Sequence, residues 1–337
     1  GAAADGENVI GKTIEDYKIL CRDYTVSLDN LQRVWEAKLE PVFPCRIKTT
    51  DTTPETYSNA NRIQRSASIK VAQPRVLIPV FPGTNCEYDT ARAFERAGAK
   101  AETIVIRNLS ASAIEESVNV FERAIKQSQI IMLPGGFSGG DEPEGSGKFI
   151  TAFFRNAKIK DAVHDLLQNR DGLMLGICNG FQALVKLGLV PFGEIIDMAD
   201  DAPTLTFNTI ARHQSMMVTT RIASNKSPWL YGCEVGDIHT IPISHGEGRF
   251  VAPDRIIQQM ANNGQIATQY VDLDGNPTMD IRYNPNTSVE AIEGITSPDG
   301  RVLGKMGHSE RIGSFVGKNV PGSKDQKIFE SGVAYFK

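Results

Sequence analysis

The sequence predicts an α/β protein in which a mostly parallel central sheet carries helices on both faces. From residue 75 onward, short apolar runs alternate with helical stretches. Each run is almost continuously apolar, as expected for strands that are buried on both faces of a sheet. Two of these runs end in glycine-rich turns, and such sheets bind ligands at the carboxyl ends of their strands.

The elements follow in order along residues 75–337. The expected strands of the parallel part are residues 76–80, 103–106, 129–133 and 172–177, and the expected helices are 87–98, 111–126, 147–167 and 181–187. After residue 190 strands dominate, at 204–207, 216–222, 239–244 and 265–271. Residues 289–296 and 301–306 flank the turn sequence SPDG and predict a hairpin.

Residues 1–72 are expected to form a separate, smaller part. A helix is predicted over residues 27–40, with Ser27 as its N-cap. Its apolar row consists of Leu28, Leu31, Val34, Trp35 and Leu39. The residues after Pro41 are rich in Thr, Ser, Asn and Pro, which is typical of an extended linker. Because one helix cannot form a core, this part must pack on something else, within the chain or beyond it.

Composition and charge restrict the class of protein. The 337 residues are 41% hydrophobic and 23% charged, which is typical of a globular protein. The net charge of -4 argues against nucleic acid as the main partner, and no apolar run has the roughly 18–20 residues that a membrane span needs. The 5 cysteines are widely spaced without a CxxC pair, so we expect neither a disulfide framework nor a metal site, and a reducing cytoplasm is indicated.

The most specific chemical feature is the segment 175–182, LGICNGFQ. An apolar strand leads into Cys178, which makes this the cysteine counterpart of a Gly-x-Ser-x-Gly nucleophile elbow. Gly176 and Gly180 are needed because so tight a turn leaves no room for a Cβ. The start of the following helix favours the thiolate, and the N–H of Asn179 can bind a developing oxyanion. The alternative is a buried structural cysteine beside chance glycines.

A cysteine nucleophile needs a base, and two of the five histidines stand in suitable patterns. His245 is followed two residues later by Glu247, and His308 by Glu310. Residues two apart in an extended segment point the same way, so either glutamate could orient its imidazole as the third member of a triad. The spacing alone does not choose between the two pairs. The end of a hairpin strand is more rigid than a glycine-rich loop, which slightly favours His308.

Two further loops are expected at the same edge of the sheet. Residues 134–141, PGGFSGGD, end a parallel strand and could supply a second oxyanion donor. A phosphate cradle is disfavoured because no P-loop lysine and no GxGxxG follow, and a plain tight turn is the remaining alternative. Cys86 also follows a strand and is a rival nucleophile, but Glu87 and Asp89 disfavour its thiolate. We expect the Cys86 loop to form the rim of the site.

Residues 75–337 resemble the class I (triad) glutamine amidotransferases. More closely, they resemble the C-terminal glutaminase domains of phosphoribosylformylglycinamidine synthases. The motifs that carry the resemblance are FPGTNCEYDTARAFERAGA, LPGGFSGGDE, GICNGFQALVKLG, SHGEGRF, YNPN and GHSER, in the expected order. The resemblance implies a flavodoxin-like fold over residues 73–337. It also implies that residues 1–72 are the tail of an upstream synthetase and a linker.

The resemblance assigns a role to individual residues. Cys178 would be the nucleophile, His308 the base and Glu310 its orienter. Gly136 and Asn179 would supply the oxyanion N–H groups. The residues implied near the substrate are Gly135, Phe137, Gln182, His245 and Glu247. Many relatives have a Tyr after GGFS and a Pro after the catalytic His, whereas this chain has Gly139 and Ser309. These departures concern the glutamine pocket rather than the triad.

The resemblance also implies the reaction and its partners. L-glutamine would be hydrolysed through a glutamyl thioester, and the ammonia would pass to a synthetase that makes formylglycinamidine ribonucleotide from formylglycinamide ribonucleotide in purine biosynthesis. That synthetase, fused upstream or acting in trans, would bind ATP and Mg²⁺, so no cofactor is expected in this chain. The alternatives are the glutaminase of another amidotransferase, a chaperone- or peptidase-like protein with the same elbow, and a non-catalytic module.

Overall fold

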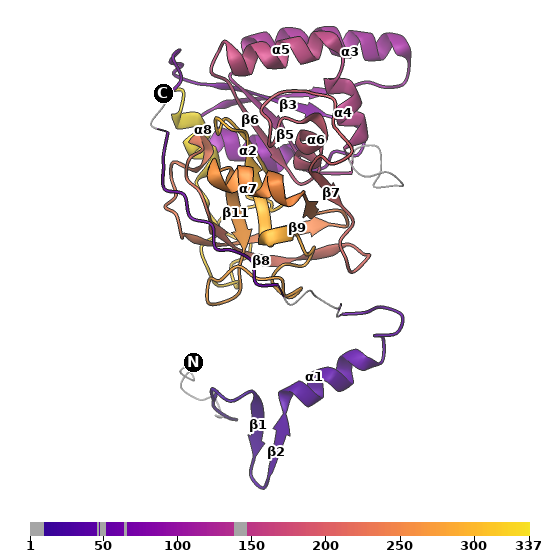
Figure 1. The fold of residues 1–337 in the computed structure, drawn as a ribbon, viewed down its shortest axis with the longest axis vertical. Coiled ribbons are helices and arrows are strands. Elements are labelled where there is room, and N and C mark those ends of the chain that lie inside the picture. Colours follow the sequence, from indigo (N-terminus) through magenta and orange to yellow (C-terminus); the bar gives the residue numbers. More distant parts are fainter. Residues whose placement is uncertain (1–9, 46, 48–51, 64–65, 138–146) are drawn as a thin grey trace. The chain divides into compact units, whose positions relative to one another are not determined.

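A computed structural model describes residues 10–45, 47, 52–63, 66–137 and 147–337 of the chain (Figure 1). Contacts between residues divide the chain into two compact units, Gly1–Lys48 and Thr49–Lys337.

The smaller unit consists of a hairpin followed by a helix. Strand β1 (Lys18–Cys21) pairs antiparallel with β2 (Tyr24–Ser27), and α1 (Leu28–Ala37) begins directly after it. The Ser27 side chain accepts a hydrogen bond from the N–H of Asn30, so the predicted helix and its N-cap are confirmed. None of the described residues of this unit is buried, and Trp35 in the apolar row of α1 is 80% exposed.

The larger unit is built on a nine-stranded sheet with the order β4-β3-β5-β6-β13-β12-β11-β8-β9. Its strands are β3 (Arg75–Val80), β4 (Lys100–Val105), β5 (Ile130–Leu133), β6 (Leu173–Ile177), β8 (Gln214–Ile222), β9 (Ile238–His245), β11 (Ile266–Tyr270), β12 (Ile292–Thr296) and β13 (Val302–Lys305). The pairs from β4 to β13 are parallel and those from β13 to β9 are antiparallel. Short strands β7 (Thr204–Thr206) and β10 (Arg249–Val251) pair separately.

Helices cover both faces of the parallel half, which confirms the expected α/β class. The α-helices described in the larger unit are α2 (Glu87–Arg96), α3 (Ala111–Gln127), α4 (Lys148–Phe154), α5 (Ala157–Gln168), α6 (Asn179–Leu187), α7 (Asp254–Asn262) and α8 (Ile328–Ala334). Parallel connections are right-handed, and β4 and β5 lie on opposite sides of β3, so α2 and α3 lie on opposite faces. Figure 1 shows α3 and α5 packed together, whereas α2 contacts α8.

One sequence prediction on the helices is refined by the structure. The helical region expected over residues 147–167 is two helices, because Asn156 interrupts it and caps α5 through the N–H of Lys158. Across the described part of the chain, no helix combines the length and apolar character that crossing a membrane requires.

Part of the predicted linker belongs to the larger unit. Tyr57 is only 8% exposed, and the N–H of Asn59 donates to Ala223 O at 2.8 Å. The N–H of Ala67 donates to Tyr335 O at 2.9 Å. By contacts, the larger unit begins at Thr49. The boundary predicted between residues 72 and 73 concerns the family domain and stays a prediction. The polar composition of this segment predicted a linker. Its backbone N–H groups instead donate to carbonyl groups of distant segments, which the local composition does not reveal.

The sheet places the site through three neighbouring strand ends. The register pairs Leu133 of β5 with Gly176 of β6, and Ile177 of β6 with Lys305 of β13. These strands are parallel, so their carboxyl ends open at one edge of the sheet. The PGGF turn, the Cys178 elbow and the His308 loop consequently meet there, although they are far apart in the sequence.

Candidate active site

Cys178 stands at a strained turn between β6 and α6. Its backbone has φ 53° and ψ -108°, a region that a non-glycine residue rarely adopts. A Cβ at Gly176 would lie 2.7 Å from Gly180 O, and a Cβ at Gly180 would lie 2.0 Å from Leu133 O. Because these contacts are with backbone atoms, neither position accepts a side chain without displacing the strand or helix. The sequence argument for the two glycines is therefore confirmed.

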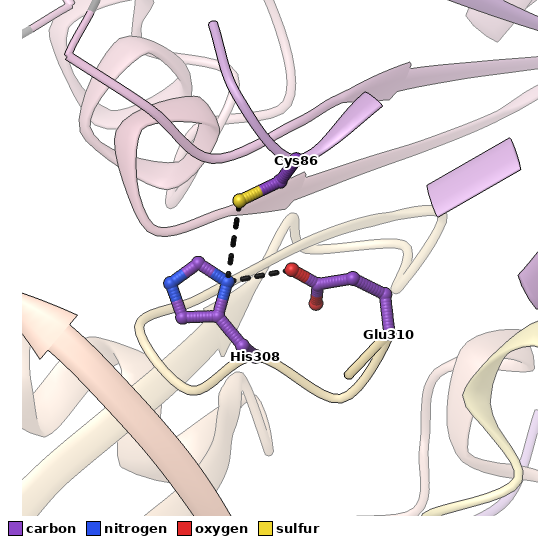
Figure 2. A group of neighbouring side chains, drawn as sticks. All are labelled: Cys86, His308 and Glu310. Atoms are coloured by element: carbon purple, nitrogen blue, oxygen red, sulfur yellow. Dashed lines mark hydrogen bonds and ion pairs between the residues drawn. The ribbon is translucent and has the colours of Figure 1, made fainter. Parts of the chain in front are cut away.

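His308 lies in the loop that follows β13. Its backbone N–H donates to Pro242 O at 2.9 Å, and its Nδ1 lies 2.6 Å from Glu310 Oε1 (Figure 2). Both residues are buried, and His308 is 1% exposed and Glu310 2% exposed. Burial lowers the pKa of His308, but Glu310 and the sulfurs of Cys178 and Cys86 more than offset it and raise that pKa well above its ordinary value. Burial raises the pKa of Glu310, yet His308 holds it below its ordinary value.

The two histidine–glutamate pairs that the sequence left open differ in the structure. His245 is fully buried, and within the described chain neither of its ring nitrogens makes a hydrogen bond, so Glu247 does not hold it. Burial is the main reason that the pKa of His245 is lowered to about 3, and the positive charge of His308 adds to the effect. His308 has its glutamate partner and His245 does not.

Gly135 lies at the centre of the convergence. A Cβ placed on it would be 2.7 Å from His308 Cε1, 3.1 Å from Cys86 Sγ and 3.5 Å from Cys178 Cβ. This point is close to the side chains of His308, Cys86 and Cys178, and Glu310 binds His308. The structure therefore brings Cys178, His308 and Glu310 together. The catalytic roles expected of these three residues stay a prediction.

Cys86 lies inside the site rather than at its rim. It is 2% exposed, and its Sγ is 3.9 Å from His308 Nδ1 (Figure 2). The same sulfur accepts a hydrogen bond from Arg311 Nη2 at 3.2 Å. Its loop is bound to the PGGF turn, because the N–H of Cys86 donates to Gly135 O and the N–H of Phe137 donates to Gly83 O. Arg311 was not among the residues predicted from the sequence, although it directly follows Glu310 in GHSER.

Cys86, His308 and Glu310 also form a potential cation site. Each offers one ligand atom, and the three atoms lie within 4.8 Å of one another (Figure 2). A thiolate, an imidazole and a carboxylate are ligands that Zn²⁺ accepts. The guanidinium of Arg311 at the Cys86 sulfur opposes a cation, and Glu310 already binds His308. The geometry is that of a polar network around His308.

The residues expected to supply oxyanion donors and to bind substrate lie around this centre. Gly136 has φ 149°, and a Cβ there would meet Gly83 O at 2.5 Å, so the turn requires glycine. Asn179 opens α6 and its side chain donates to Gln182 Oε1 at 3.0 Å, while Gln182 Nε2 donates to Glu247 O at 2.5 Å. Residue 139, one of the departures from relatives, falls outside the described part.

The SHGEGRF and YNPN motifs are held against each other nearby. Asn286 Nδ2 donates to Gly248 O at 2.6 Å, and a Cβ at Gly248 would meet the His245 ring at 2.5 Å. The Phe137 ring stands 6.1 Å from the His213 ring and is 37% exposed, so it faces solvent in part. A cavity of about 630 Å³ elsewhere in the larger unit includes Tyr231 and Tyr335 in its lining and none of these site residues.

Comparisons with known proteins agree with this fold. Residues 73–336 match the family described as CobB/CobQ-like glutamine amidotransferase domain. The phosphoribosylformylglycinamidine synthase subunit PurQ of Methanococcus maripaludis is 38% identical over 247 residues, which cover 72% of this chain and 84% of that subunit. The same subunit of Aquifex aeolicus is 32% identical, with 73% and 92% covered. The structure of PurLQS from Thermotoga maritima has a TM-score of 0.57 at 26% identity and covers 79% of this chain and 100% of its own. The chain belongs to the CobB/CobQ-like glutamine amidotransferase family.

Proposed function

We propose that this chain is the glutaminase part of a phosphoribosylformylglycinamidine synthase and hydrolyses glutamine with Cys178, His308 and Glu310. The relatives named above support the choice of synthase. The observation that carries the catalytic assignment is the meeting of three segments at one sheet edge, where the His308 ring and Cys178 both approach Gly135 and Glu310 binds His308 Nδ1.

The reaction begins with a thiolate and an imidazolium. Cys178 lies at the start of α6, where the helix favours negative charge, and the raised pKa of His308 keeps the imidazole protonated beside it. The thiolate attacks the side-chain amide carbon of glutamine, and the N–H groups of Gly136 and Asn179 stabilise the resulting oxyanion. His308 then gives its proton to the departing nitrogen, which leaves as ammonia.

The second half of the reaction regenerates the enzyme. The product of the first step is a glutamyl thioester on Cys178 and a neutral His308. His308 takes a proton from water, the resulting hydroxide attacks the thioester, and glutamate leaves while the sulfur returns to thiolate. Glu310 keeps Nδ1 protonated throughout, so that Nε2 is the nitrogen that exchanges protons.

The ammonia passes to a synthetase, which forms the amidine from an ATP-activated amide. We assign ATP and Mg²⁺ to that synthetase, in keeping with relatives that are named as subunits of a larger synthase. The smaller unit has exposed apolar side chains such as Trp35 and Leu39, which suit packing on synthetase sequence. All five cysteines are free, which fits a reducing cytoplasm.

The nucleophile is tested by replacing each of the two candidate cysteines. The chain and its synthetase are assayed together for glutamate release, and the chain is labelled with a glutamine-derived chloroketone. We expect Cys178→Ala to lose both hydrolysis and labelling, and Cys86→Ala to remain labelled at Cys178. Hydrolysis that survives in Cys178→Ala but disappears in Cys86→Ala would assign the chemistry to the other sulfur.

A further inference from the structure

A buried ion pair lies directly behind the His308 loop. Lys305 ends β13 and Glu293 lies on the neighbouring strand β12, and their Nζ and Oε1 atoms are 3.1 Å apart. Both side chains have 0% exposure. Thr268 Oγ1 donates to the other carboxylate oxygen of Glu293 at 2.5 Å. Charges buried this completely are costly unless every polar group has a partner. The other groups that bind this pair are therefore needed to keep it buried.

Those partners are the peptide groups and the side chain on both sides of His308. Lys305 Nζ donates to Gly307 O at 2.9 Å and to Ser309 Oγ at 3.1 Å. With Glu293, these acceptors account for all three N–H bonds of the ammonium. In return, the N–H of Gly307 donates to Glu293 Oε1 at 2.6 Å. Both polar groups of the Gly307 peptide backbone and the Ser309 hydroxyl are thus bound to one ion pair.

The loop has little freedom to take another position. A Cβ at Gly307 would lie 2.1 Å from Ile241 Cδ1 and 2.9 Å from Glu293 Oε1, so this backbone is pressed against β9 and the ion pair. Ser309 Oγ also donates to Gln326 Oε1 at 2.6 Å, which ties the far side of the loop to the segment before α8. A shift of the loop would leave a buried charge without its partners.

We infer that Lys305 and Glu293 act as positioning residues that hold His308 in register with Cys178 and Glu310. This inference rests on the proposed function of His308. Replacing a buried ion pair by neutral side chains often leaves stability unchanged, so the pair is not required by stability alone. What it supplies is a fixed position for the Gly307 backbone groups on one side of His308 and for the Ser309 hydroxyl on the other. A displacement of about 1 Å at a reacting group lowers turnover by about 100-fold.

The test removes both charges together. Lys305→Met/Glu293→Gln leaves no buried charge unpaired and keeps an acceptor for the N–H of Gly307, but it removes the ammonium from Gly307 O and Ser309 Oγ. Val302→Ala is the matched control, because Val302 is buried on the same strand and lies on the face opposite Lys305. Turnover and KM for glutamine are measured with the synthetase present, the melting temperature is recorded, and the pKa of His308 is followed by NMR.

We expect the double variant to lose about 10–100-fold in kcat with little change in KM. The pKa of His308 should fall toward its ordinary value as Glu310 and His308 separate, whereas Val302→Ala should lower the melting temperature and leave kcat and that pKa unchanged. Wild-type kcat and an unchanged His308 pKa in the double variant would overturn the inference. If the double variant fails to fold, Ser309→Ala gives the same test with a smaller expected fall in kcat. Activity that survives in His308→Ala would instead refute the proposed function.

Discussion

Gly135→Ala adds a single methyl group at the point where the site converges, and its effect follows from distances. Gly135 does not have a positive φ, so alanine is allowed by the backbone and only space matters. The new Cβ would lie 2.7 Å from His308 Cε1, whereas carbon atoms pack at about 3.5 Å or more. The imidazole must therefore retreat by about 0.8 Å, from the difference of these two distances.

That retreat should affect turnover more than stability. A displacement near 1 Å at a catalytic group costs about 100-fold in kcat, while added bulk in a packed site destabilises by about 1–3 kcal/mol. Steady-state hydrolysis of glutamine gives kcat and KM, and thermal unfolding gives stability. Gly313→Ala is a suitable control, because a Cβ there has ordinary contacts only, at 3.6 Å from Val316. A Gly135→Ala enzyme with kcat within about twofold of wild type would refute the convergence on which the site is built.

Three further predictions concern single groups of the site. Glu310→Gln removes the negative charge 2.6 Å from His308 Nδ1, so the pKa of His308 and kcat should both fall, kcat by about 10²–10⁴-fold; an unshifted pH–rate profile would contradict this. His245 has a pKa of about 3 in the folded chain and of about 6.5 in the unfolded chain. As the pH falls below about 6.5, the unfolded state therefore binds more protons than the folded state. Stability should therefore fall by up to about 4–5 kcal/mol as the pH drops from about 6.5 toward 3, and His245→Gln should abolish this part of the loss in urea titrations; equal acid sensitivity would count against the assignment. Gly180→Ala puts a Cβ 2.0 Å from Leu133 O, so the melting temperature should fall sharply, and a wild-type value would mean that the elbow tolerates side chains.

Local sequence chemistry determined the scaffold of the site. Continuous apolar runs predicted strands buried on both faces, and β3, β5 and β6 are such strands. Glycines on both sides of Cys178 predicted a tight elbow, and nearby backbone atoms leave no room for a side chain at either glycine. The SPDG turn predicted the hairpin that ends at the His308 loop. In each case the cause is steric or conformational and lies within a few residues, so the sequence displays it.

Only the tertiary structure decided which groups meet. His245-Gly-Glu247 and His308-Ser-Glu310 have the same spacing, and the difference is that one glutamate binds its histidine while the other histidine is left without a hydrogen bond. The approach of Cys86 to His308 depends on segments more than two hundred residues apart in the chain. The antiparallel order beyond β13 and the packing of the segment around Tyr57 are equally non-local. Spacing fixes the direction in which neighbouring side chains point, whereas a hydrogen bond between distant segments exists only once the sheet has brought their ends to one edge.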